Sequence, residues 1–278
     1  MLKLGDYNTL RIVKQVDFGL YLDGGDEGEV LLPKRYTTPS MHIGDELEVF
    51  IYLDQDERIV ATTETPLAKV GEFAHLEVAW TNQYGAFMKW GLMKDLFCPF
   101  REQKQRMVQG NRYIVYVKED EESHRLMATA KVERYLEPLE EKQGLLHGDA
   151  VDCLIWQKTD LGFKAIINNK YQGQLYDNQI FQPLRTGDRV TAYIDHIRQD
   201  GKTDLTLQPT GRRHTLDFAE VLLRYLHENN GHCDLSDKSP AELIADRFKV
   251  SKKAYKKAIG DLYRRRLITI SDEGINLV

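Results

Sequence analysis

Most of the chain alternates hydrophobic and polar residues in three similar blocks, at residues 5–64, 71–133 and 144–210. Alternation with a period of two is typical of strands that bury one face. Each block opens with such a stretch, has a glycine and a polar residue before a later strand, and closes with a short strand after an acidic turn. Five short strands joined by polar turns in about 65 residues predict a small closed β-barrel in each block.

A glycine recurs at the same place in each block, beside aromatic residues. Residues 18–21 read Phe-Gly-Leu-Tyr, residues 84–87 read Tyr-Gly-Ala-Phe, and Gly162 is followed by Phe163. On a strand, Phe18 and Leu20 are expected to share one face and Tyr21 the other. The glycine lets another backbone or a ligand approach closely. The three glycines are 66 and 77 residues apart, a period that suits tandem small domains.

The pattern changes to a helical period after residue 213. Apolar residues at 218, 222, 223 and 226 mark one face of a first helix. Ser239, followed by Pro240 and Glu242, predicts the capped start of a second helix, with Leu243, Ile244 and Phe248 in its core. Ser251 is expected to cap a third helix, and two apolar stretches around residues 271–274 predict a terminal hairpin. Three helices and a hairpin resemble a winged-helix domain.

The order of the landmarks in each block resembles the S1 RNA-binding domain, which is an oligonucleotide-binding (OB) barrel. The resemblance implies a mainly β, multidomain fold. It has three S1/OB barrels of five strands at residues 1–65, 70–134 and 144–210, then an α+β winged-helix domain at residues 213–278. The linker at residues 65–68 is short and apolar, so the first two barrels are expected to touch.

The resemblance also implies which side chains bind RNA. Members of the S1 family stack bases on two strand aromatics and use a nearby histidine and a basic residue. By position, the histidine falls on Leu31, Phe97 and Tyr176, and the basic residue on Arg58, Arg125 and Asp204. Exposed rings are general stacking platforms, and cations bind phosphate. The predicted RNA-binding residues are Phe18, Tyr21, Tyr84, Phe87, Lys89, Phe97, Arg125, Trp156, Phe163, Lys164 and Tyr176.

Three S1-like barrels followed by a winged helix resemble the bacterial conserved virulence factor B family over nearly the whole chain. The resemblance implies a non-catalytic RNA-binding regulator of gene expression. In winged-helix domains the third helix usually enters the major groove of DNA. The corresponding nucleic-acid-binding candidates are Lys252, Lys253, Lys256, Lys257, Arg264 and Arg265.

Charge and cysteine content narrow the partners and the setting. The net charge of −5 hides a gradient, because residues 1–64 carry 6 basic and 13 acidic side chains, whereas residues 213–278 carry 12 and 10. Phosphate contacts dominate nucleic-acid affinity, so the first block is the least suited to RNA. Three widely spaced cysteines fit a reduced cytoplasmic setting. No apolar run approaches a membrane span, so no membrane partner is expected.

The sequence contains no motif typical of a catalytic site, a metal site or a cofactor site. The Gly201-Lys202-Thr203 stretch imitates the end of a phosphate-binding loop, but His196 stands where that loop needs glycine. His232 and Cys233 lack companions at metal-ligand spacing. Single-stranded RNA is the partner that the S1 resemblance implies. Two alternatives stay open: a winged-helix regulator that binds DNA, and an adaptor that docks on a protein or ribonucleoprotein.

Overall fold

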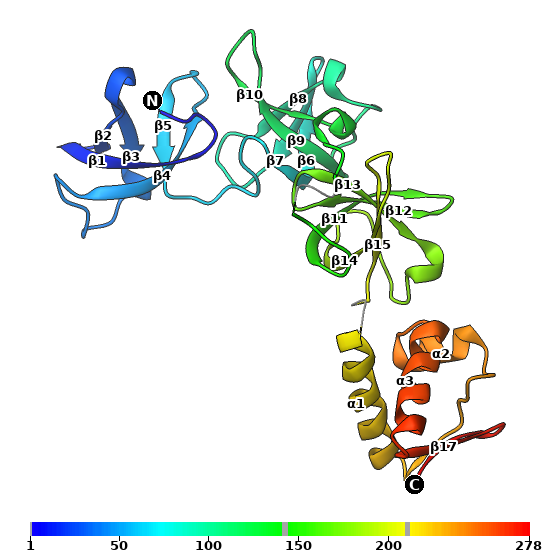
Figure 1. The fold of residues 1–278 in the computed structure, drawn as a ribbon. Coiled ribbons are helices and arrows are strands. Elements are labelled where there is room, and N and C mark those ends of the chain that lie inside the picture. The colour runs from blue at the N-terminus through cyan, green and yellow to red at the C-terminus, as the bar shows by residue number, and fades with distance from the viewer. Residues whose placement is uncertain (1, 141–143, 209–211) are drawn as a thin grey trace. The chain divides into compact units, whose positions relative to one another are not determined.

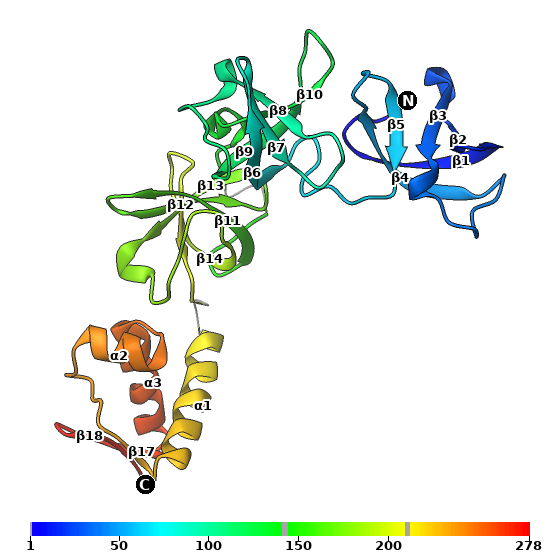
Figure 2. The same cartoon turned by 180° about the vertical axis from the view of Figure 1, so that it is seen from behind.

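The structure is a computed structural model that describes residues 2–140, 144–208 and 212–278 (Figure 1). It divides into two compact units, Met1–Tyr135 and Leu136–Val278, each of which is described by itself. Five-stranded barrels and a small domain of helices and strands make up these units (Figure 2). The predicted fold class is confirmed, while residue 210, the predicted end of the third domain, lies outside the described residues.

Each barrel joins its five strands in the same order: first, second, third, fifth and fourth along the chain. The pairs are antiparallel except the third with the fifth, which run parallel and close the barrel. The first barrel contains β1 (Tyr7–Val16), β2 (Gly19–Asp23), β3 (Glu29–Pro33), β4 (Glu46–Leu53) and β5 (Ile59–Thr62). The second contains β6 (Phe73–Thr81), β7 (Gly85–Lys89), β8 (Leu96–Pro99), β9 (Arg112–Glu119) and β10 (Leu126–Thr129). The third contains β11 (Ala150–Thr159), β12 (Gly162–Ile167), β13 (Tyr171–Tyr176), β14 (Arg189–Ile197) and β15 (Thr203–Thr206).

The recurring glycine lies where two strands of the barrel come closest. A methyl group placed on Gly19 would lie 2.2 Å from the carbonyl oxygen of Leu32, and on Gly85 it would lie 2.4 Å from that of Cys98. On Gly162 it would lie 2.1 Å from the carbonyl oxygen of Leu175. No larger residue fits this position without displacing the neighbouring backbone. The predicted close approach is therefore a backbone–backbone contact in all three barrels.

The first two barrels share a buried interface, as their short linker predicted. Phe50, Tyr52 and Val60 of the first barrel belong to the same buried cluster as the core of the second. The ring of Phe50 meets that of Trp90 edge to face, with centroids 5.9 Å apart. The indole nitrogen of Trp90 donates a hydrogen bond to the carbonyl of Lys94, so the buried ring has no unpaired donor. The two barrels therefore pack as one body within the first unit.

The C-terminal domain has the predicted three helices and a hairpin. Tyr255, Ala258, Ile259 and Leu262 all point into its core, as their spacing predicted. A two-residue strand that was not predicted pairs with the last strand and widens the hairpin to a three-stranded sheet. The elements are α1 (Arg212–Glu228), β16 (His232–Cys233), α2 (Ala241–Phe248), α3 (Lys252–Arg264), β17 (Ile268–Ser271) and β18 (Gly274–Leu277).

The helix starts follow the predictions only in part. Ser251 caps α3 as predicted, its hydroxyl accepting a hydrogen bond from the backbone nitrogen of Ala254 at 3.1 Å. The capping box predicted for α2 is wrong, because Pro240 occupies the cap position and the Ser239 hydroxyl accepts a bond from Ser236 instead. Leu243 is also not a core residue: it is 53% exposed, while Ile244 takes the buried position.

Candidate nucleic-acid interface

One row of side chains crosses the same four strands on the outside of every barrel. Strand register aligns one residue from each of the first, second, third and fifth strands. In the first barrel the row is Lys14, Tyr21, Leu31 and Val60. In the second it is Trp80, Phe87, Phe97 and Met127. In the third it is Gln157, Lys164, Gln174 and Asp204.

In the second barrel the first three side chains of this row are aromatic. The rings of Trp80 and Phe87 stack with centroids 3.7 Å apart and planes 3° from parallel, and Phe97 follows at 4.9 Å from Phe87. Tyr84, in the turn before β7, is 65% exposed, and Trp80 is 43% exposed. The structure therefore brings three of the predicted residues, Tyr84, Phe87 and Phe97, together with one that was not predicted.

Trp80 escaped prediction because a β-bulge changes the phase of its strand. Leu76 and Val78 are buried, so strict alternation would place Trp80 inside the barrel as well. The register of β6 against β7 shifts between Val78 and Trp80, which adds one residue and turns Trp80 outward. All three barrels have the same shift in their first strand, after Ile12, Val78 and Ile155.

The expectation that Phe87 offers a flat face for a base is corrected. Because β7 lies between β6 and β8, Phe87 has Trp80 on one side and Phe97 on the other. The Trp80 ring covers one face of Phe87, and the Phe97 ring, tilted by 35°, lies against its other side, so Phe87 is half-buried. The exposed rings of this group are the outermost ones, Trp80 and Tyr84.

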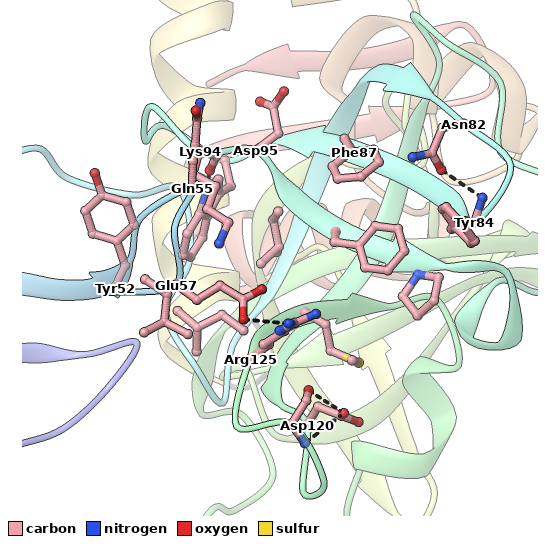
Figure 3. A pocket seen from close by; sticks show the side chains of 18 of the residues that line it. Tyr52, Gln55, Glu57, Asn82, Tyr84, Phe87, Lys94, Asp95, Asp120 and Arg125 are labelled. Carbon is pink, nitrogen blue, oxygen red and sulfur yellow. Dashed lines mark hydrogen bonds and ion pairs between the residues drawn. The ribbon is translucent and has the colours of Figure 1, made fainter. Parts of the chain in front are cut away.

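These rings line a pocket of about 670 Å³ at the junction of the first two barrels. Asn82 lies beside Tyr84, and its side-chain oxygen accepts a hydrogen bond from the Tyr84 backbone nitrogen at 2.8 Å. Across the pocket, Gln55 and Glu57 project from the β4–β5 turn of the first barrel (Figure 3). An aromatic wall and a polar rim of this kind are typical of sites for flat ligands that carry hydrogen-bonding edges.

The cations that line the pocket are already engaged. Arg125 donates a hydrogen bond to Glu57 at 2.5 Å, which joins the two barrels (Figure 3). The ammonium of Lys94 donates to the carbonyl of Asp54 at 2.7 Å, and burial lowers the Lys94 pKa. Arg101 pairs with the carboxylate of Asp120 at 3.1 Å. A hydrogen bond from Ser123 holds the pKa of Asp120 below its usual value. A phosphate that enters the pocket must compete with these partners.

Lys89, also predicted to bind phosphate, lies outside the lining of this pocket. Its ammonium pairs with the carboxylate of Glu77 at 2.6 Å, and Arg112 approaches the same carboxylate at 3.6 Å. The pKa of Glu77 is lowered, chiefly by the hydrogen bond from Lys89. Lys89 is therefore part of a surface ion-pair network beside the pocket.

The first barrel presents two rings in an acidic setting. Phe18 does not share the face of Leu20, because it lies in the turn before β2 and is 58% exposed. It meets Tyr21 edge to face at 6.2 Å, and the ammonium of Lys14 lies 5.3 Å from the Tyr21 ring centre. Arg58 pairs with both Asp54 and Asp56. The two rings are accessible, but no large aromatic surface forms here.

The third barrel buries two of the three rings predicted for it, Trp156 and Phe163, whereas Tyr176 is half-buried. Trp156 is 6% exposed and Phe163 is 7% exposed, so burial removes both from the candidate surface. Lys164 lies with its ammonium 5.1 Å from the centre of the Trp156 ring, and the guanidinium of Arg198 binds the Tyr176 hydroxyl. These polar groups border a groove of about 300 Å³.

The register also corrects the alignment of the third block with the other two. Gln174 pairs with Lys164 in the third barrel, just as Phe97 pairs with Phe87 in the second. The residue equivalent to Phe97 is therefore Gln174, and Tyr176 lies two residues further along the strand. Asp204 matches Val60 and Met127, so the residue equivalent to Arg58 and Arg125 is Lys202. The third barrel therefore keeps a basic residue at this position, where the predicted alignment had an acid.

The predicted basic residues of the winged helix lie on or just after α3. Lys253, Lys256 and Lys257 are exposed, and Lys252 is half-buried. Several approach carboxylates: Lys256 lies 3.8 Å from Asp237, and Arg264 and Arg265 lie 3.5 and 3.6 Å from Asp261. The helix therefore presents a basic surface that is partly neutralised by its neighbours.

Two further observations concern the described residues only. Within residues 2–140, 144–208 and 212–278, no cluster of three or more histidine, cysteine, aspartate or glutamate side chains could hold a metal ion. No helix in these ranges combines the length and apolar character needed to cross a membrane.

Family models match two parts of this architecture. Residues 4–64 match the family model of the S1 domain, and residues 220–277 match that of the CvfB-like winged helix domain. Both models describe nucleic-acid-binding types of domain and not enzymes. A solved structure from Streptococcus pneumoniae, described as a multidomain protein with nucleic acid binding domains, is 20% identical with a TM-score of 0.44. The match covers 99% of this chain and 98% of that one.

Two curated relatives match most of the chain. The uncharacterized protein YitL of Bacillus subtilis is 28% identical over 94% of this chain and 89% of its own length. Conserved virulence factor B of Staphylococcus saprophyticus is 24% identical over 85% of this chain and 81% of its own length. The predicted resemblance to the conserved virulence factor B family is thus confirmed, with an S1 domain near the start of the chain and a CvfB-like winged helix at its end.

Proposed function

We propose that this protein binds single-stranded RNA in the pocket of the second barrel and acts as a non-catalytic regulator of gene expression. The observation that carries the proposal is the aromatic row that ends at Trp80, together with the exposed ring of Tyr84. Unpaired bases expose faces that stack on aromatic rings, whereas the bases of a duplex are already stacked on one another. An accessible pair of rings in one pocket therefore favours a single strand over a duplex.

The charges around the pocket support a binding mode in which stacking contributes more than phosphate contacts. The lining contains the acids Glu57, Asp95 and Asp120 and the bases Lys94, Arg101 and Arg125, and is therefore balanced. Each phosphate that is neutralised on a single strand adds about 0.7 to the slope of log affinity against log salt. The proposal therefore predicts a shallow slope of log affinity against log salt, with a magnitude below about 2.

The winged helix and the cytoplasmic setting belong to the same proposal. The basic surface of α3 would add a second contact, and linked sites strengthen each other when both can bind at once. The three cysteines, Cys98, Cys153 and Cys233, are free and buried, which suits a reduced compartment. Duplex DNA on α3 is the second candidate function, favoured by the exposed lysines of that helix.

The test is a competition titration at two salt concentrations with the double variant Trp80→Ala, Tyr84→Ala. Loss of two stacking rings is expected to weaken binding of a single-stranded RNA by at least about tenfold. Phe18→Ala is the matched control, because it removes the turn ring at the corresponding place in the first barrel. Unchanged RNA affinity in the folded double variant, or tighter binding of duplex DNA by the wild type, would contradict the proposal.

A further inference from the structure

The carboxylate of Asp95 is fixed at the edge of the Trp80 ring. Its Oδ2 atom accepts a hydrogen bond from the indole nitrogen of Trp80 at 3.0 Å. Because an indole N–H bond lies in the plane of its ring, Oδ2 lies near that plane beside the nitrogen, and Oδ1 of the same carboxylate is left for a ligand. Asp95 immediately precedes β8, is half-buried and lines the pocket (Figure 3). A charged group is therefore held next to a ring that can carry a base.

The carboxylate keeps hydrogen-bonding capacity for a ligand. An ionised carboxylate has about four lone-pair positions, so the bond to Trp80 leaves others for a ligand. Among the described residues, the hydrogen bond of the Asp95 side chain is to Trp80 and not to a basic residue. The neighbouring ammonium of Lys94 donates to the carbonyl of Asp54. A donor on a ligand would therefore meet an acceptor whose position is already determined.

A base that stacks on the outer face of Trp80 brings one edge over the indole nitrogen and within reach of Asp95. The carboxylate can only accept, so it favours edges with N–H donors and repels edges that present carbonyl oxygens. Guanine offers two adjacent donors on its Watson–Crick edge, at N1 and at the 2-amino group. Adenine and cytosine offer one amino group each, and uracil offers one N–H between two carbonyl oxygens.

We infer that Asp95 determines base preference in this pocket, with guanine bound best and uracil worst. The inference rests on the proposed function, because it assumes that the pocket holds RNA. It makes the second barrel a reader of base edges as well as a stacking surface. Trp80 has two roles in this arrangement: its face supports the base, and its N–H orients the carboxylate.

The experiment measures the affinity of full-length protein for eight-nucleotide uridine RNAs that carry one guanosine, inosine, adenosine or cytidine. We expect guanosine to bind about fivefold to tenfold more tightly than the all-uridine RNA, at the low end of what base-edge hydrogen bonds contribute. Inosine lacks the 2-amino group and should bind with intermediate affinity. In Asp95→Asn the affinities for the guanosine RNA and the all-uridine RNA should differ by no more than about twofold, because an amide both donates and accepts hydrogen bonds.

Two further variants separate the possible outcomes. Trp80→Phe keeps a stacking ring but removes the N–H that orients Asp95. This variant should therefore also reduce the preference for the guanosine RNA over the all-uridine RNA. Asp23→Asn, an equal charge change on an exposed strand end of the first barrel, should leave it unchanged. Equal binding of all RNAs by the wild type, or full preference in Asp95→Asn, would overturn this inference while leaving RNA binding intact. Failure to bind any of the RNAs would contradict the proposed function itself.

Discussion

The carboxylate of Glu57 in the first barrel accepts a hydrogen bond from the guanidinium of Arg125 in the second, at 2.5 Å. Both side chains line the pocket that the two barrels form. Arg125 occupies the position at which the S1 resemblance places a phosphate-binding cation. Under the proposed function, an acidic residue of the neighbouring barrel therefore occupies the place of an RNA phosphate.

The first prediction is that Glu57→Gln strengthens RNA binding about twofold to fivefold, because the pair is roughly half-exposed and such pairs contribute about 1 kcal/mol or less. Arg125 would lose its charged partner in this variant and would then be available to a phosphate. The slope of log affinity against log salt should also become steeper by about 0.7, the contribution of one more phosphate contact. Fluorescence anisotropy at several salt concentrations measures both quantities.

The control for Glu57 is Glu27→Gln, which removes the same charge from an exposed position of the first barrel outside the pocket. If the gain in RNA affinity came only from the change in net charge, the two variants would bind RNA equally well. Equal gains in affinity would show that the ion pair with Arg125 does not compete with RNA.

The second prediction concerns the glycine at the strand contact of the third barrel. Gly162→Ala should destabilise that barrel by about 2 kcal/mol or more, since its methyl group would overlap the carbonyl of Leu175. Gly260→Ala is the matched control: a methyl group there meets no atom within 4 Å, and the site lies within α3. That variant should gain about 0.5–1 kcal/mol. Chemical unfolding monitored by circular dichroism compares the two, and similar effects would contradict the proposed packing role.

The third prediction is that Ser251→Ala destabilises the winged-helix domain by about 1 kcal/mol, because α3 loses the side chain that caps it. Ser251→Asp should restore most of the loss, since aspartate caps equally well and its charge suits the helix start. Thermal unfolding, followed by circular dichroism at a wavelength sensitive to helix content, compares the stabilities of the variants. A neutral Ser251→Ala variant would show that the cap contributes little to this helix.

The fourth prediction concerns acid stability of the turn that carries Glu57. Burial raises the pKa of Asp54, but hydrogen bonds from Arg58 and from the backbone outweigh it, and the net pKa lies below 3.8. A lowered pKa in the folded state means that the carboxylate stabilises the fold above its unfolded pKa. That contribution disappears as the pH falls through the folded value.

Wild-type protein should therefore be more stable than Asp54→Asn near pH 6, and the difference should shrink as the pH falls below 3.8. Unfolding midpoints in denaturant at a series of pH values measure this difference. Asp26→Asn, at an exposed position in the same barrel, serves as the control and should not reproduce the pH dependence. A difference that stays constant with pH would contradict the assignment to Asp54.

The alternating pattern was sufficient to predict three barrels, because period-two burial and polar turns are local features of the sequence. It was not sufficient to predict Trp80. A bulge inserts one residue without any change in composition, and this reverses the face of every residue after it. Phe18 was also misplaced: it was assigned to a strand, whereas it lies in the turn before β2.

The predicted site was least accurate where long-range packing decides exposure. Trp156 and Phe163 are rings in a strand, and the sequence alone does not show whether a ring points inward or outward. The pairing of Glu57 with Arg125 joins residues far apart in the chain, so no local pattern could indicate it. The basic surface of α3 was predictable, because four lysines follow one another at helical spacing.

The outward row of side chains has the same backbone in every barrel, yet it holds rings in one, amides and charges in another, and a mixture in the first. The bulge turns the first-strand member of each row, Lys14, Trp80 or Gln157, away from the barrel core, so the identity of this residue can change without affecting that core. Gene duplication could then supply one scaffold with several surfaces, each altered by substitutions that leave folding intact. A chain of this design can acquire or lose a ligand one barrel at a time.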